Sequence, residues 1–83
     1  MGTNDLAKEF NAVPTPDRLA FLFSLSAALV AARAYSLAAI DGVYNDINNE
    51  AGLATECEKG RVLGFDGKTL IHPAQVDVTN ECF

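Results

Sequence analysis

The chain has 83 residues, enough for one small domain that buries roughly 60% of the surface of its unfolded chain. A hydrophobic content of 49% is ordinary for a globular protein, and a net charge of −5 with a pI near 4.5 argues against nucleic-acid binding. Asp5, Lys8 and Glu9 interrupt any early apolar run, so we expect no signal peptide. Cys57 and Cys82 have no pattern typical of a zinc site or a disulfide scaffold, which predicts reduced thiols in a cytoplasmic protein.

The amino-terminal part is expected to lead from a strand end into a long helix. Residues 2–6 read as a strand end followed by a short helical turn, and residues 12–16 read as a loop. A helix is then predicted from about Pro16 to Ser36. Thr15 is its expected N-cap, and Asp17 is a first-turn carboxylate that the helix dipole favours.

That predicted helix is apolar on nearly all sides, because its large side chains cannot share one face at 3.6 residues per turn. They are Leu19, Phe21, Leu22, Phe23, Leu25, Leu29 and Val30. The charge-free stretch from residue 19 to residue 32 is shorter than the roughly 20 residues that cross a bilayer, so no membrane interaction is expected. Such a helix should be covered on several sides. In so short a chain it predicts a homo-oligomer that shares this helix or its strands between copies.

A strand and a second helix are predicted next. The strand covers about Ala38–Val43, and the helix runs from about Asn49 to Leu63. Asn48 or Asn49 is the expected cap, with Glu50 in the first turn and Arg61 near the end, as the helix dipole favours. The expected inward face comprises Leu53, Cys57 and Val62 or Leu63.

The segment from Gly64 to Gln75 is the most informative part of the sequence. Gly64 can adopt the left-handed conformation that ends a helix, and Asp66–Gly67 is a typical turn pair. Thr69–Ile71 predict a strand buried on both faces, as in a parallel sheet. His72–Pro73 should end that strand, and a last helix is expected from about Pro73.

The alternation of strands and helices predicts an α/β fold with parallel strands joined by crossover helices. Polar or special residues follow each expected strand: Asn4–Asp5, Asp41–Gly42 and His72–Pro73. Because the carboxyl ends of parallel strands meet at one edge, these residues should line one rim. That rim is where α/β enzymes hold their chemistry.

Three motifs together resemble a known family. They are Gly64-Phe65-Asp66-Gly67-Lys68 running into Ile71-His72-Pro73-Ala74-Gln75, Ile40-Asp41-Gly42-Val43-Tyr44-Asn45-Asp46, and Gly2-Thr3-Asn4-Asp5-Leu6. In this order they resemble the carboxyl-terminal part of the citrate lyase beta subunit and malyl-CoA lyase group of the HpcH/HpaI aldolase superfamily. The resemblance implies a partial TIM barrel, from the end of strand six through strand seven at 38–43 and strand eight at 68–71 to the start of helix eight. A whole barrel needs about 250 residues, so residues 1–83 are expected to be a single truncated barrel segment.

The resemblance also implies a function for the longer parent protein. Such enzymes are magnesium-dependent carbon–carbon lyases that act on an acyl-CoA such as malyl-CoA, citramalyl-CoA or a citryl-type substrate. The magnesium ligands, the substrate-binding arginine and the general acid/base of that family are expected outside this chain. We therefore expect no catalytic residue and no bound metal here, and no activity of the isolated chain. The alternatives are a non-catalytic module that associates with itself, and a piece of a class II pyruvate aldolase.

Several residues are candidates for the rim of the substrate or CoA site, each with a structural alternative. Asp41 would orient a substrate group or fix its own loop, and Asp5 with Asn4 would do the same or cap a helix. Tyr44 would contact CoA or pack in its loop, and His72 would lie beside CoA or form a structural hydrogen bond. Lys68 is expected in a structural ion pair. The full set of rim candidates is Asn4, Asp5, Asp41, Gly42, Tyr44, His72 and Pro73.

Overall fold

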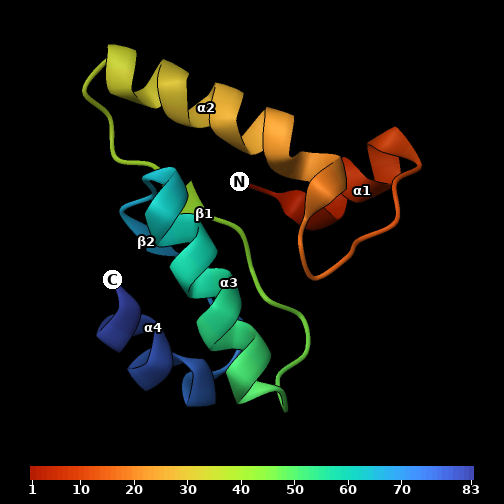
Figure 1. Cartoon of the computed structure of the whole chain (residues 1–83), viewed down its shortest axis with the longest axis vertical. Helices are drawn as coiled ribbons and strands as arrows, with labels where there is room; N and C mark the ends of the chain where they lie inside the picture. The colour runs from red at the N-terminus through yellow and green to blue at the C-terminus, as the bar shows by residue number, and fades with distance from the viewer.

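A computed structural model describes all 83 residues of the chain (Figure 1). Four α-helices and two short strands follow one another as α1 (Thr3–Phe10), α2 (Leu22–Ala34), β1 (Ile40–Asp41), α3 (Glu50–Leu63), β2 (Gly67–Lys68) and α4 (Val76–Cys82). A 3-10 turn at Leu19–Phe21 leads into α2, and another at Pro73–Gln75 leads into α4. α3 and α4 lie side by side at one end of the molecule, and α2 crosses the other end.

The two strands pair in parallel, with Ile40 opposite Gly67 and Asp41 opposite Lys68. α3 is the crossover between them, so the predicted pair of parallel strands with a crossover helix is confirmed. The strands are shorter than predicted, however, and the expected strand at Thr69–Ile71 is wrong. Thr69 makes only one ladder-like contact, from its backbone N–H to the Asp41 carbonyl at 3.1 Å, and the chain then turns away. With one neighbour apiece, the strands keep regular pairing for two residues only.

The amino-terminal segment is helical rather than a strand end. α1 begins at Thr3, directly after Gly2, and continues to Phe10, so the expected helical turn is present and longer than predicted. The terminal amino group of Met1 donates to the Ile40 carbonyl at 2.8 Å. The chain therefore starts beside β1, although it forms no strand there.

The start of the long helix also differs from the prediction. Thr15 is no N-cap: its hydroxyl donates to the Asp17 carboxylate at 2.6 Å, and that carboxylate accepts from the Leu19 N–H at 3.1 Å. Arg18 has a left-handed backbone, with φ of 54°, which turns its side chain toward the interior. A helix through Pro16–Arg18 would not allow that turn, so helical geometry begins only at Leu19.

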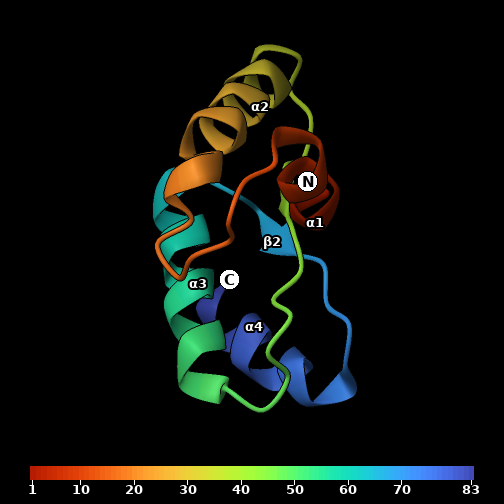
Figure 2. The same ribbon diagram turned by 90° about the vertical axis from the view of Figure 1, so that its right-hand side faces the viewer.

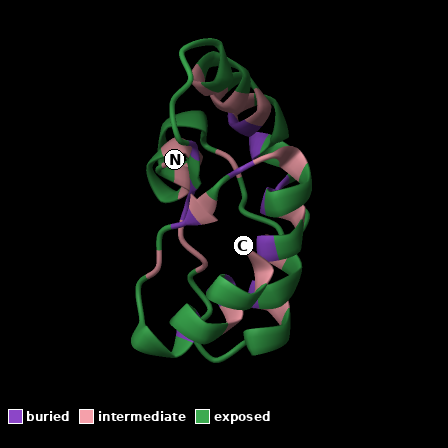
Figure 3. Cartoon of the chain, turned by 90° about the vertical axis from the view of Figure 1, so that its left-hand side faces the viewer, coloured by how far each residue is buried: buried purple, intermediate pink, exposed green.

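The core is small, and most of the ribbon in Figure 3 is exposed. Thirteen of the 83 residues are buried. The chain by itself therefore leaves much of its apolar helix uncovered, as its short length predicted. The main cluster joins Phe21 and Leu25 from the α2 region to Ala39 and Phe65 beside the strands. Large apolar side chains remain exposed, including Leu19, Phe23, Val30 and Val62. None of the helices has the length and apolar character needed to cross a membrane.

Local signals around α3 and α4 are confirmed. The Asn49 side chain caps α3 by accepting from the Gly52 N–H at 2.9 Å. Leu53 and Cys57 are buried on its inner side, and at its end Leu63 rather than Val62 turns inward. The last helical segment begins at Pro73, as expected, and His72 Nδ1 caps it by accepting from the Ala74 N–H at 3.0 Å. The strand that His72–Pro73 was expected to end is absent, because β2 already ends at Lys68.

Gly64 ends α3 in the left-handed region, with φ of 114°, and a Cβ there would lie 2.9 Å from a Leu29 methyl carbon. We expect Gly64→Ala to lower the free energy of unfolding by about 1–2 kcal/mol, measured by urea denaturation. The matched control is Gly67→Ala, because a Cβ at Gly67 meets only Ile40 at 3.7 Å. The control should change stability by less than about 0.5 kcal/mol. Equal losses in both variants would contradict this account of Gly64.

Candidate functional site

Side-chain amides tie the expected rim segments together. Asn4 and Asn45 exchange two hydrogen bonds, at 3.0 and 2.8 Å, which join the start of α1 to the loop after β1. The buried Gln75 donates to the Tyr44 carbonyl at 3.0 Å and accepts from the Ile71 N–H at 3.1 Å, which joins that loop to the segment after β2. Figure 2 shows the start of α1 beside the chain that leaves β1. The three segments predicted to form one rim are therefore connected in the structure.

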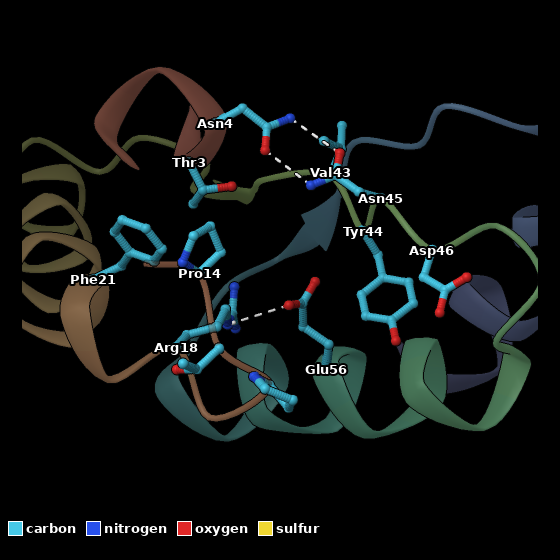
Figure 4. Close-up of a pocket in the computed structure, with 12 residues that line it drawn as sticks. Thr3, Asn4, Pro14, Arg18, Phe21, Val43, Tyr44, Asn45, Asp46 and Glu56 are labelled. Atoms are coloured by element: carbon cyan, nitrogen blue, oxygen red, sulfur yellow. Dashed lines mark hydrogen bonds and ion pairs between the residues drawn. The ribbon is translucent and has the colours of Figure 1, made fainter. Parts of the chain in front are cut away.

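An open cavity of about 270 Å³ lies between these loops and α3 (Figure 4). The start of α1 forms one wall, the loop before α2 a second, and the chain after β1 a third. Glu56 reaches into the cavity from α3, opposite Arg18. Its lining residues are Thr3, Asn4, Pro14, Thr15, Pro16, Arg18, Phe21, Val43, Tyr44, Asn45, Asp46 and Glu56.

The rim candidates from the sequence separate into three groups around this cavity. Asn4 and Tyr44 line it. Asp41 and Gly42 are buried beneath it, and Gly42 has no room for a side chain, because a Cβ would lie 2.5 Å from the Met1 carbonyl oxygen.

The third group lies outside the cavity and is exposed. Asp5 is on α1 and makes no side-chain hydrogen bond or ion pair. His72 and Pro73 form the start of the turn before α4, where His72 acts as a cap. The structure thus joins the rim loops without bringing all seven candidate side chains together.

Beneath the cavity, four charged side chains form a buried network. Asp41 accepts from Arg18 Nη1 at 2.7 Å and from Lys68 Nζ at 3.1 Å. Lys68 also donates to Glu56 Oε2 at 2.7 Å, and Arg18 Nε lies 3.6 Å from Glu56 Oε1. The side chains of Asp41 and Lys68 have no exposed surface, and that of Arg18 is 6% exposed. The expected structural ion pair of Lys68 is confirmed, although Lys68 ends β2 rather than beginning the strand.

The fold positions this network through strand pairing and one close helix contact. Asp41 and Lys68 are direct partners in the parallel pair, so their side chains leave the sheet on the same side. α3 lies over that side, and Gly60 provides the space, because a Cβ there would be 2.8 Å from Asp41 Oδ2. The Gly42 N–H adds a further hydrogen bond to Asp41 at 2.8 Å.

The network keeps Asp41 ionised. Burial by itself raises the pKa of Asp41, but the hydrogen bond from Arg18 and the positive charges of Lys68 and Arg18 outweigh it. The resulting pKa is below the ordinary value of 3.8. Its oxygens are all engaged, so Asp41 can approach a substrate only if the network is broken.

Two members of the network, Arg18 and Glu56, are absent from the sequence-based candidates. Arg18 lies in a loop whose conformation depends on tertiary contacts. The available signal for Glu56 was its i, i+4 spacing from Gly60 on α3, which places both residues on the face toward the strands. That spacing would have indicated a close approach of this helix face to a strand side chain.

Asp41→Asn should destabilise the chain strongly, because it leaves Arg18 and Lys68 buried with one carboxylate between them. Loss of one partner from such a network costs about 3–5 kcal/mol in the free energy of unfolding, measured by urea denaturation. The matched control is Glu58→Gln, which removes a carboxylate from the exposed Glu58–Arg61 pair on α3. Because water screens that pair, the control should have a much smaller effect. Similar losses in the two variants would contradict the structural importance of the buried network.

The fold and the site together define a class of protein: a parallel α/β segment whose loops converge at the carboxyl ends of its strands. The model of the HpcH/HpaI aldolase/citrate lyase family matches residues 1–73. The chain belongs to this family, as the resemblance of its three motifs predicted.

Individual relatives agree with this assignment. The chain is 59% identical over all 83 residues to a protein of Cereibacter sphaeroides named (3S)-malyl-CoA thioesterase, and covers 29% of it. It is 37% identical over 83 residues to the citrate lyase subunit beta of Escherichia coli, and covers 28% of that protein. The chain therefore spans less than a third of the length of these two relatives.

The fold is also similar to a solved structure. RipC from Yersinia pestis superposes with a TM-score of 0.92 at 27% sequence identity, over 98% of this chain and 37% of the RipC chain. The arrangement of two parallel strands among helices is thus one that RipC contains within a longer chain.

Proposed function

We propose that this chain is a segment of an enzyme that acts on an acyl-CoA of the malyl-CoA type. The observation that carries the proposal is the 59% identity over the whole chain to a protein named (3S)-malyl-CoA thioesterase. In the proposed parent, residues 1–83 form the carboxyl-terminal part of a TIM barrel, from the end of strand six to the start of helix eight. The parallel pairing of β1 and β2 and the likeness to RipC support that placement. The free thiols Cys57 and Cys82 fit a cytoplasmic protein.

Two reactions on the same substrate are candidates. The first is magnesium-dependent carbon–carbon cleavage of the 3-hydroxyacyl-CoA, which the three sequence motifs favour. The second is hydrolysis of the thioester, which the name of the 59% identical relative favours. Both need a loop rim that holds the acyl-CoA, and the cavity bordered by Asn4 and Tyr44 is the part of that rim this chain would supply.

A magnesium site would need ligands from the rest of the parent protein. This chain has no group of three or more side chains that would hold a metal ion. Asp41 and Glu56 are engaged by Arg18 and Lys68. The free carboxylates near the rim are those of Asp5 and Asp46. If this chain supplied a carboxylate ligand to a magnesium ion at the rim, that ligand would be Asp5 or Asp46.

Incubation of the parent protein with (3S)-malyl-CoA and Mg²⁺ separates the two reactions by their products. Carbon–carbon cleavage releases acetyl-CoA and glyoxylate, whereas thioester hydrolysis releases malate and free CoA. We expect one of these product pairs, detected by chromatography, and loss of carbon–carbon cleavage when EDTA removes the metal. A pyruvate aldolase would instead release pyruvate from a hydroxy-oxo acid. Absence of turnover on malyl-CoA, citramalyl-CoA and citryl-CoA by the folded parent would overturn the proposal.

The isolated 83-residue chain is expected to turn over none of these substrates. The metal ligands and part of the substrate site are expected in the rest of the parent protein, and the cavity of this chain is open. Turnover at ordinary enzyme rates by the purified chain would contradict its assignment as an incomplete part of the active site.

The exposed apolar side chains favour self-association of the isolated chain as a second property. Phe23 is 85% exposed on α2, and Leu19 and Val30 are 70% and 69% exposed. We expect a dimer or larger species in multi-angle light scattering at micromolar concentration, and a shift toward monomer in Phe23→Lys. The matched control is Phe10→Lys, which changes an exposed phenylalanine on α1. A stable wild-type monomer would contradict this prediction.

A further inference from the structure

The outer side of α2 and of the 3-10 turn before it carries an exposed apolar stripe with a regular repeat. Its members are spaced alternately three and four residues apart, and every one of them is exposed. They are Ala20, Phe23, Ala27, Val30 and Ala34. At 3.6 residues per turn this spacing keeps them on one side of the helix, opposite the core residues Phe21 and Leu25. The repeat is that of a coiled-coil seam, in which a and d positions alternate.

Small and large side chains alternate along this stripe. Alanine occupies one position of each repeat, and Phe23 and Val30 occupy the other. In an antiparallel pair, the a positions of one helix face the d positions of its partner, so every layer combines an alanine with a large side chain. In a parallel pair, Phe23 would meet Phe23 and alanine would meet alanine, which leaves layers of unequal width. The stripe is therefore complementary to itself in the antiparallel orientation, which a two-fold axis between identical chains produces.

The charges at the two ends of the stripe agree with that orientation. No charged side chain lies between Arg18 and Arg33, so the stripe can be buried without removing an ion from water. The exposed Asp17 precedes one end, and Arg33 lies at the other. Arg33 binds Asp66 through its two terminal nitrogens, which leaves its Nε for a further carboxylate. An antiparallel pair brings Asp17 of each copy toward Arg33 of the second copy and places opposite ends of the helix dipoles side by side.

The rest of the parent protein would leave this side of α2 open. α2 lies at one end of the molecule with no element over its outer side (Figure 1). In the barrel proposed above, further strands would join β1 and β2 edge to edge, so their helices would lie beside α2 and not over it. The occupant that fits the outer side is therefore another chain with a matching apolar repeat.

We propose that α2 pairs in antiparallel orientation with α2 of a second copy of this chain, through the stripe from Ala20 to Ala34. The proposal defines the surface behind the self-association proposed above. It rests on the proposed barrel and does not depend on which reaction the parent protein catalyses.

Isotope-filtered NMR on a mixture of labelled and unlabelled 83-residue chain tests the orientation without any variant. We expect contacts between copies from the Phe23 ring to the methyl group of Ala27 or Ala34. Contacts of Phe23 with Phe23 and of Val30 with Val30 in the same sample would indicate a parallel pair and overturn the proposal. A monomer, or contacts between copies that lie away from α2, would overturn it as well. Absence of turnover on an acyl-CoA bears on the proposed reaction alone, so the two proposals fail separately.

A substitution in the stripe tests its packing. Ala27→Leu places two large side chains in one layer and forces the helices apart, so the Kd of the dimer should rise roughly tenfold in analytical ultracentrifugation. Undirected hydrophobic association would instead become stronger with the added leucine. The matched control is Ala54→Leu, at an exposed alanine of α3, which should leave the Kd unchanged. Unchanged or stronger association of Ala27→Leu, or equal weakening in both variants, would overturn the proposal.

Discussion

The buried network of Arg18, Asp41, Glu56 and Lys68 is the interaction on which the rest of the structure depends. Its members come from the loop before α2, from both strands and from α3, so it joins segments that a small apolar core holds only loosely. Ionised groups removed from water are costly, and only mutual pairing offsets that cost. Two cations and two carboxylates achieve this balance, whereas any three of them leave a buried charge uncompensated.

Several local features follow from the network. Gly60 lets α3 approach Asp41, and Gly42 lets the start of the chain pass over the end of β1. The left-handed backbone of Arg18 interrupts the predicted helix, so that helical geometry begins with the 3-10 turn at Leu19 and α2 itself begins at Leu22. Two sets of contacts therefore fix the conformation of the rim loops. One is the buried charge network, and the other is the Asn4–Asn45 amide pair.

The sequence predicted those features that neighbouring residues determine. The end of α3 at Gly64, its cap at Asn49 and the start of the last helical segment at Pro73 each depend on one or two residues and their backbone preferences. The start of α2 and the lengths of the strands were predicted wrongly, because both depend on distant partners. A strand over Thr69–Ile71 would need a second neighbour to continue its pairing.

The candidate site shows the same limit. Reasoning from parallel strands brought the rim segments together correctly, but it could not reveal which side chains stay free. Asp41 follows its strand as an active-site carboxylate would, yet Arg18 and Lys68 occupy both of its oxygens. The group left with unused bonding capacity is instead Nη2 of Arg18, in a loop with no motif of its own. Because the bond to Asp41 fixes the direction of the guanidinium, the position of Arg18 is determined by the buried charge network and not by the sequence around it.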